Sequence, residues 1–133
     1  MKKSTKIILI SLAVIILIVI CLFIPTIVES VYFNKVTSAS TPAETVAACD
    51  RYMNKCPNGK HVEDVLFIKI CKCEDSQETI KALDRYIDQY PNSEEIPLFE
   101  IFREYLLSNP EGTFDEFKAS IRNRIDQDSA ERE

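Results

Sequence analysis

Two stretches of this sequence nearly repeat each other. The segment "DRYMNKCPN" spans 50–58, and "DRYIDQYPN" spans 84–92. We call the offset from position 50 to position 84 the repeat period. Apolar residues near both stretches recur at intervals that place them on one face of a helix. In three successive copies, each one period after the last, this face consists of Val46, Cys49, Met53 and Cys56; of Ile80, Leu83, Ile87 and Tyr90; and of Phe114, Phe117 and Ile121. The repeat therefore predicts a regular series of packed helices.

The segments between these helices follow the same period. Their apolar residues are Val62, Val65, Ile68 and Cys71 in one copy and Ile96, Phe99, Phe102 and Tyr105 in the next. Taken alone, "VLFIKICKC" has the β-branched, alternating residues typical of a strand, but its partner "PLFEIFREYLL" has a helical pattern, and the shared period assigns both to helices. Pro, Gly and Asn between the segments end each helix. We predict an all-α domain of about five antiparallel helices, over 42–56, 60–73, 77–90, 94–107 and 114–127.

Antiparallel helix pairs that recur every ~34 residues are typical of tetratricopeptide repeats, and residues 41–127 resemble that family. The ending "ALDRYIDQYPNSEE" is most similar to repeats of bacterial envelope-assembly proteins, such as the outer-membrane assembly lipoproteins and the Tol-Pal-associated coordinator. Pro57 and Pro91 match the proline that closes each unit, and Leu66 and Leu83 match apolar positions of the family. The departures, where the family has small residues, are Phe67, Ile101 and Tyr86. The resemblance implies a short, degenerate, right-handed array in which a lone helix precedes a repeat pair; a generic helical bundle is the alternative.

A long apolar run precedes this domain. Residues 7–24 read "IILISLAVIILIVICLFI", without a charge, and the apolar character continues to Val28. About 20 such residues cross the hydrocarbon core of a bilayer, so we predict a transmembrane anchor over 7–28. A secretory signal peptide has a shorter apolar core followed closely by small residues, which this run lacks. A lipidated Cys21 is the other alternative, but Ile20 stands where a lipoprotein signal has a small residue.

The flanks of the run predict its orientation. Lys2, Lys3 and Lys6 precede the anchor, whereas Lys35 is the first basic residue after it. Because positive residues stay in the cytoplasm, we expect residues 1–6 to form a cytoplasmic tail and the rest to be exported across a bacterial inner membrane. We predict that residues 29–40 form a stalk and that residues 128–133 form a polar tail.

The charge of the exported part excludes one class of partner. The whole chain has a net charge of −5, and without the three N-terminal lysines it is −8. A surface that follows phosphates needs clustered Lys and Arg. Nucleic acid is therefore not expected as a partner.

Four cysteines lie in the predicted exported domain, namely Cys49, Cys56, Cys71 and Cys73. Disulfides persist in exported proteins, and the helix pairing brings Cys49 near Cys71 and Cys73, so a bridge between Cys49 and either of them is one expectation. The other is that these thiols are small core residues. A zinc site is less favoured, because the C-x6-C and C-x-C spacings match no standard zinc motif.

The sequence contains no recognisable catalytic motif. Its one histidine, His61, follows Gly59 near a predicted helix start, where a solvated side chain is the simpler reading. We therefore expect no enzyme activity, no metal and no cofactor.

Two functions remain. The first is a membrane-anchored interaction or scaffolding module that binds another protein or peptide, as the resemblance implies. In the family the first helix of each unit lines the concave face, which makes five polar residues the candidates for partner binding: Glu63, Lys69, Lys72, Glu100 and Arg103. The alternative is a structural accessory subunit of a membrane complex, without a peptide-binding groove of its own.

Overall fold

The chain is all-helical. A computed structural model describes the backbone of residues 3–130 and the side chains of residues 10–127, and this part of the chain contains six helices and no strand. The helices are α1 (Lys3–Thr37), α2 (Pro42–Lys55), α3 (Val62–Lys72), α4 (Ser76–Gln89), α5 (Ile96–Ser108) and α6 (Phe114–Ala130). The all-α prediction is confirmed. The ends of the predicted tails, residues 1–2 and 131–133, lie outside the described residues.

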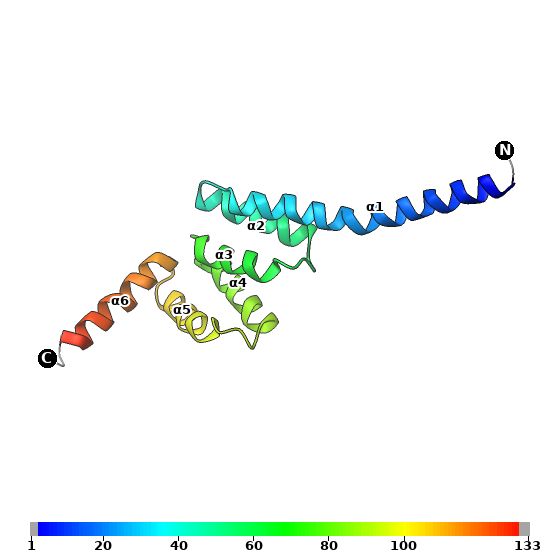
Figure 1. Cartoon of the computed structure of the whole chain (residues 1–133). Helices are drawn as coiled ribbons and strands as arrows, with labels where there is room; N and C mark the ends of the chain where they lie inside the picture. The colour runs from blue at the N-terminus through cyan, green and yellow to red at the C-terminus, as the bar shows by residue number, and fades with distance from the viewer. Residues whose placement is uncertain (1–2, 131–133) are drawn as a thin grey trace.

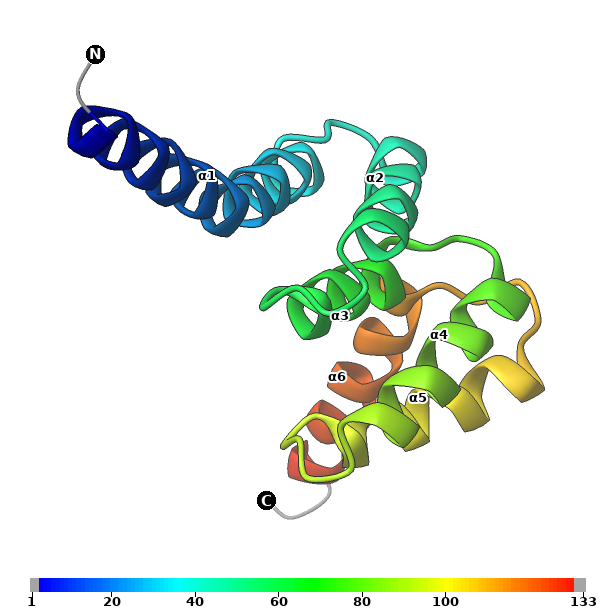
Figure 2. The same cartoon turned by 90° about the vertical axis from the view of Figure 1, so that its right-hand side faces the viewer.

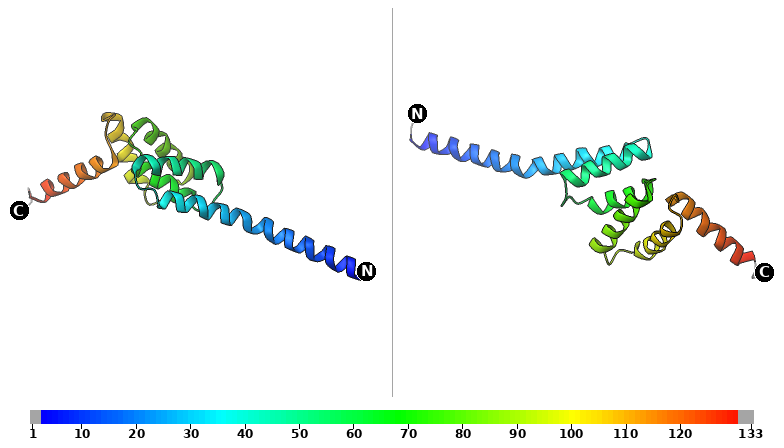
Figure 3. Two further views of the ribbon diagram at one scale, coloured as in Figure 1. Left: turned by 90° about the horizontal axis from the view of Figure 1, so that it is seen from above. Right: turned by 180° about the vertical axis from the view of Figure 1, so that it is seen from behind.

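The long helix α1 projects from a cluster formed by the other helices (Figure 1). Its N-terminal end and the C-terminal end of α6 lie at opposite ends of the molecule. Two further views show α2 folded back along the last part of α1 (Figure 3). Helices α3 to α6 form the rest of the cluster, with α4 and α5 side by side (Figure 2).

Side-chain caps explain where the shorter helices begin. Thr41 Oγ1 accepts a hydrogen bond from the Glu44 N–H (3.2 Å) at the start of α2, and Asp75 Oδ1 accepts one from the Glu78 N–H (2.8 Å) at the start of α4. Such caps satisfy backbone donors that have no partner within the helix.

Helix α1 does not end where the predicted anchor ends. The stalk expected over 29–40 is instead helical as far as Thr37, and its residues belong to the folded domain. Val36 is only 3% exposed, and Tyr32 and Phe33 pack beside it against α2 and α3. The stretch "ESVYFNKVT" contains no Gly or Pro and has apolar residues at helical spacing, so the helix continues until "SAS".

The N-terminal part of α1 is apolar and exposed. Residues 10–37 have a mean hydropathy of 3.1 in their most apolar window, and none of that window is buried. This helix is long and apolar enough to cross a membrane, and it alone has these properties within the described residues. The prediction of a membrane-spanning length at 7–28 agrees with this finding.

Two apolar clusters hold the domain together. The first joins the end of α1 to α2 and α3, and its buried residues are Val36, Ala48, Cys49, Tyr52, Val62 and Val65. The second is formed by the four helices α3, α4, α5 and α6. Its buried residues are Leu66, Ile70, Ala82, Leu83, Tyr86, Phe99, Phe102, Leu106, Phe114 and Phe117. The partly buried Met53 packs against both clusters and connects them.

The buried face of α2 and α4 is rotated slightly from the predicted one. Cys49 and Leu83 are fully buried at equivalent positions, as predicted. The tyrosines Tyr52 and Tyr86 are also buried, whereas Ile87, expected in the seam, is only half-buried. A tyrosine fits there because its hydroxyl donates a hydrogen bond to a carboxylate on the preceding helix.

Candidate interaction surface

A tyrosine–carboxylate hydrogen bond occurs twice, one repeat period apart. Tyr52 Oη donates to Glu29 Oε1 (2.7 Å), and Tyr86 Oη donates to Glu63 Oε1 (3.0 Å). Each bond joins a helix to the preceding one, α2 to α1 and α4 to α3. Burial raises the pKa of Tyr52, and the hydrogen bond to Glu29 raises it further. We call these two contacts the Tyr–Glu pairs.

An ion pair also occurs twice with the same offset. Lys69 Nζ lies 2.6 Å from Asp50 Oδ1, and Arg103 Nε lies 2.6 Å from Asp84 Oδ1. Lys69 has a second partner in Glu78, whose Oε1 lies 3.4 Å away. Burial acts to lower the pKa of Lys69, but Asp50 and Glu78 outweigh it and raise that pKa. Lys69 is therefore held in its charged form between α2 and α4.

These contacts account for three of the five polar residues predicted to face a partner. Glu63 accepts the tyrosine hydrogen bond, Lys69 is buried at 8% exposure, and Arg103 pairs with Asp84. Lys72 and Glu100 are exposed. Three residues of the predicted face thus join helices to one another. Of these three, Glu63 also lines the pocket described next.

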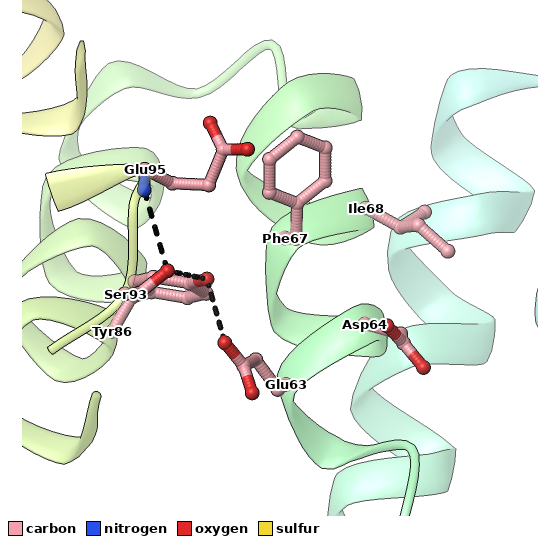
Figure 4. Close-up of a pocket in the computed structure, with 7 residues that line it drawn as sticks. All are labelled: Glu63, Asp64, Phe67, Ile68, Tyr86, Ser93 and Glu95. Atoms are coloured by element: carbon pink, nitrogen blue, oxygen red, sulfur yellow. Dashed lines mark hydrogen bonds between the residues drawn. The ribbon is translucent and has the colours of Figure 1, made fainter.

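That pocket lies where α3 meets α4 and the turn before α5 (Figure 4). It has a volume of about 390 Å³. Its lining residues are Glu63, Asp64, Phe67, Ile68, Tyr86, Ser93 and Glu95. In the close-up, Glu95 and Phe67 approach each other across its upper part, and Glu63 lies across from Ser93 and Tyr86. We call this site the acidic pocket.

A chain of hydrogen bonds fixes one wall of the acidic pocket. Tyr86 Oη lies 2.9 Å from Ser93 Oγ, and Ser93 Oγ accepts a hydrogen bond from the Glu95 N–H (3.3 Å). Burial raises the pKa of Tyr86; Ser93 opposes this shift and Glu63 adds to it. The tyrosine therefore stays protonated at neutral pH and keeps Glu63 in place.

The remaining wall gives the pocket its chemical character. Three of its lining residues carry carboxylates, and none is Lys or Arg. Asp64 has one nearby basic group, since its Oδ2 lies 3.1 Å from His61 Nδ1. Phe67 and Ile68 supply apolar surface beside these charges. Such a combination suits a lysine or arginine side chain, whose carbon stem packs on apolar surface while its charge pairs with a carboxylate.

The sequence pointed to Glu63 but not to the rest of the acidic pocket. Ser93 lies in a turn that the helical pattern treats only as a break, and Glu95 lies at the start of the helix predicted over 94–107 but before the observed start of α5. Tyr86 was read as a departure from a small residue. The signal that could have found it is the pair Glu29 and Tyr52, which stands one repeat period before Glu63 and Tyr86.

All five cysteines lie in the described residues, and all are free thiols. The predicted bridge from Cys49 to Cys71 or Cys73 is not formed. Cys49 belongs to the first apolar cluster and Cys71 packs against the second, while Cys73 Sγ points to Asp75 O (3.4 Å). Burial raises the pKa of both Cys49 and Cys71 to about 12. These two thiols are therefore protonated core residues at neutral pH.

His61 packs against the end of α1 and contacts α2. Its ring stacks on Phe33 with a centroid distance of 3.9 Å and an interplanar angle of 11°. Its backbone N–H donates to Tyr52 Oη (3.2 Å). Within the part of the chain that the structure describes, no three His, Cys, Asp or Glu side chains are arranged to hold a metal ion.

Comparison with protein-family models, curated proteins and solved structures finds no match to this chain. The resemblance to tetratricopeptide repeats therefore depends on the residues quoted above, and the functional argument depends on the geometry of this structure.

Proposed function

We propose that this chain is a membrane-anchored helical-repeat protein that serves as a protein interaction or scaffolding module. The N-terminal part of α1 spans a bacterial inner membrane with its N-terminus in the cytoplasm. The helices from the end of α1 to α6 lie on the outer side and bind another protein or peptide. The observation that carries this proposal is an apolar segment of α1 with no buried residue in its most apolar window, which continues in the same helix into a packed helical domain.

The repeated contacts support a tetratricopeptide-like, right-handed array of antiparallel helix pairs. The Tyr–Glu pairs recur after one repeat period, and so do the ion pairs of Lys69 and Arg103. Because a Tyr–Glu pair joins α1 to α2 as well as α3 to α4, the first unit of the proposed array includes the end of α1. The helix at 42–55 is then not a lone helix.

The acidic pocket is the proposed contact point for the partner. Its carboxylates favour a partner segment that presents lysine or arginine, and its apolar wall can cover the stem of that side chain. We test this with a photo-reactive phenylalanine analogue at position 67, in the full chain in its own membranes. The control position is Ile101, which is the repeat equivalent of Phe67 and is 54% exposed.

The expected result is a discrete adduct with one partner from position 67 and none from position 101. The double variant Asp64→Asn, Glu95→Gln should weaken that adduct, because it removes two charges from the pocket and leaves the Tyr–Glu pair intact. Equal adduct yields from positions 67 and 101 would contradict the role of the pocket in partner binding. An adduct yield that is the same in the double variant would contradict it as well.

The alternative function is a structural accessory subunit of a membrane complex. One observation favours it, since Glu63, Lys69 and Arg103 are engaged between helices. In that case the apolar surface of α1 makes the important contacts. A photo-reactive residue at Leu17, which is 64% exposed, should then give the discrete adduct and position 67 should give none.

A further inference from the structure

The turn between α2 and α3 lies against the long helix. It borders a small hollow of about 260 Å³, lined on one side by Pro25, Val28 and Glu29 and on the other by residues 55–59. Gly59 packs tightly against Tyr52 and Glu29. A Cβ added at this position would lie 2.5 Å from Tyr52 Oη and 2.9 Å from Glu29 Oε1. The turn is therefore fixed at the level where the apolar part of α1 ends.

This level corresponds to the surface of the membrane. A hydrocarbon core about 30 Å thick takes roughly 20 helical residues, which places its outer edge near Val28 when the span begins near residue 7. The α2–α3 turn lies on the side of the domain that faces the N-terminal part of α1 (Figure 1). In both Figures 1 and 2 the α4–α5 turn lies farther from α1. The α2–α3 turn is thus the part of the domain next to the lipid headgroups.

The charge of this turn is unusual for the chain. Residues 51–61 contain Arg51, Lys55 and Lys60 and no Asp or Glu, although the whole chain has a net charge of −5. All three basic side chains are exposed, and the described residues provide none of them with an ion pair. Glu29, which lines the same hollow as the turn, already accepts hydrogen bonds from Tyr52 Oη and the His61 N–H.

The repeat provides an internal comparison. In the sister turn, one repeat period later, Lys55 is replaced by Gln89 and Lys60 by Glu94. Residues 85–95 contain one basic residue and three acidic ones. The two turns share the "PN" motif and the shape of the chain, so the repeat fold does not require the lysines. Of these two segments, only residues 51–61, beside the proposed membrane surface, have a net positive charge.

We propose that Arg51, Lys55 and Lys60 form a basic surface that binds the headgroups of anionic phospholipids in the leaflet from which α1 emerges. This surface rests on the membrane anchor of the proposed function and adds a second contact with the same bilayer. A basic residue near an anionic membrane surface favours contact by about fivefold. The surface therefore holds the domain close to the lipid, and the effect falls as salt is added.

Tryptophan fluorescence tests this contact, because the chain contains no Trp. We insert the full chain into vesicles with brominated lipids and compare three single substitutions. Asn58→Trp reports on the basic turn, Asn92→Trp on the equivalent turn, and Leu17→Trp on the anchor. In vesicles that contain phosphatidylglycerol, we expect strong quenching for Leu17→Trp, clear quenching for Asn58→Trp and none for Asn92→Trp. In vesicles of phosphatidylcholine alone, only Leu17→Trp should remain strongly quenched.

Charge exchange between the two turns provides the decisive variant. Lys55→Gln with Lys60→Glu installs the residues of the sister turn, which that fold already accommodates, and should abolish the quenching of Asn58→Trp. The matched change Gln89→Lys with Glu94→Lys should leave it unaltered.

Two outcomes would overturn the proposal while leaving the anchor intact. One is strong quenching of Leu17→Trp without any at Asn58→Trp. The other is quenching of Asn58→Trp that depends neither on phosphatidylglycerol nor on the lysines. The turn would then lie near the bilayer without binding its anionic headgroups. Loss of quenching at Leu17→Trp would instead remove the membrane anchor and the proposed function with it.

Discussion

Tyr86 shows how a single polar group connects the fold to its candidate site. Its ring is buried in the core at 2% exposure, and its hydroxyl reaches Glu63 and Ser93 at the edge of the acidic pocket. A buried hydroxyl without a partner would destabilise the fold. The carboxylate therefore lets a large aromatic residue occupy this seam.

The hydroxyl of Tyr86 can be tested by itself. Tyr86→Phe removes both hydrogen bonds and keeps the ring, so we expect the free energy of unfolding to fall by about 0.5–1.5 kcal/mol. Tyr90→Phe is the matched control, because Tyr90 is half-buried at the end of the same helix and lacks such a bond; its effect should stay below about 0.5 kcal/mol. Urea unfolding of the domain measures both, and equal losses would contradict the role of the hydroxyl.

Leu83 tests the centre of the core. It is fully buried, so Leu83→Ala should open a cavity and reduce the free energy of unfolding by about 2–5 kcal/mol. That is a large share of the roughly 5–15 kcal/mol typical of a small domain. Asp88→Ala, at an exposed position of the same helix, should change it by no more than about 0.5 kcal/mol. A similar loss at both positions would contradict the helical packing described for α4.

The buried thiols predict how stability depends on pH. Folding raises the pKa of Cys49 and Cys71 from 9.0 to about 12, because burial disfavours the thiolate. The folded state thus retains protons that the unfolded state loses, so the contribution of these thiols to stability is constant below pH 9 and falls as the pH rises from 9 towards 12. Urea unfolding at a series of alkaline pH values should show this decline, and Cys49→Ala with Cys71→Ala should reduce its slope. An unaltered slope in the double variant would assign the decline to other groups.

At the scale of elements, the helices were largely predictable and the role of α1 was not. The five predicted helices lie within about two residues of α2 to α6 at most ends, because Thr, Asp, Pro and Gly mark their boundaries. The C-terminal part of α1 was missed because the apolar run dominates that region and the small residues at 38–40 suggested a flexible stalk. Glu29 stands one repeat period before Glu63, but periodicity alone cannot show that each acid accepts a hydrogen bond from a tyrosine on the next helix. Contacts between distant segments set that detail.

The end of α1 should therefore stabilise the domain that follows it. A fragment of residues 29–133 retains Val36, Phe33 and the pair of Glu29 with Tyr52, whereas a fragment of residues 41–133 lacks them all. We expect the shorter fragment to lose at least about 2 kcal/mol of unfolding free energy, measured by urea unfolding.

Two point variants of the longer fragment are the controls. Val36 is 3% exposed and Val31 is 47% exposed, so Val36→Ala should cost about 1.5 kcal/mol and Val31→Ala far less. Equal stability of the two fragments would restore the stalk as the correct description of 29–40.

At the scale of the whole molecule, the charge flanks of α1 predict its topology. Lys2, Lys3 and Lys6 precede the apolar run, which favours a cytoplasmic N-terminus. Protease added to cells with a permeable outer layer should digest the helical domain and spare a small membrane fragment. A soluble mature form that begins near Thr41 would contradict a retained anchor, and complete protection of the domain would contradict its orientation.

Helix α1 continues into the packed domain without an intervening loop. This continuity has a mechanical consequence. A stalk would let the domain turn independently of the membrane, but α1 is one helix from Lys3 to Thr37, and its interior Pro25 is the position at which it can bend. Spans tilt when the thickness of the surrounding bilayer changes, so in the proposed membrane-anchored protein a tilt that bending at Pro25 does not absorb moves the acidic pocket and the far end of α6 with the span. For the proposed membrane-anchored protein, we therefore expect the orientation of the domain relative to the membrane to depend on the thickness of the bilayer around α1.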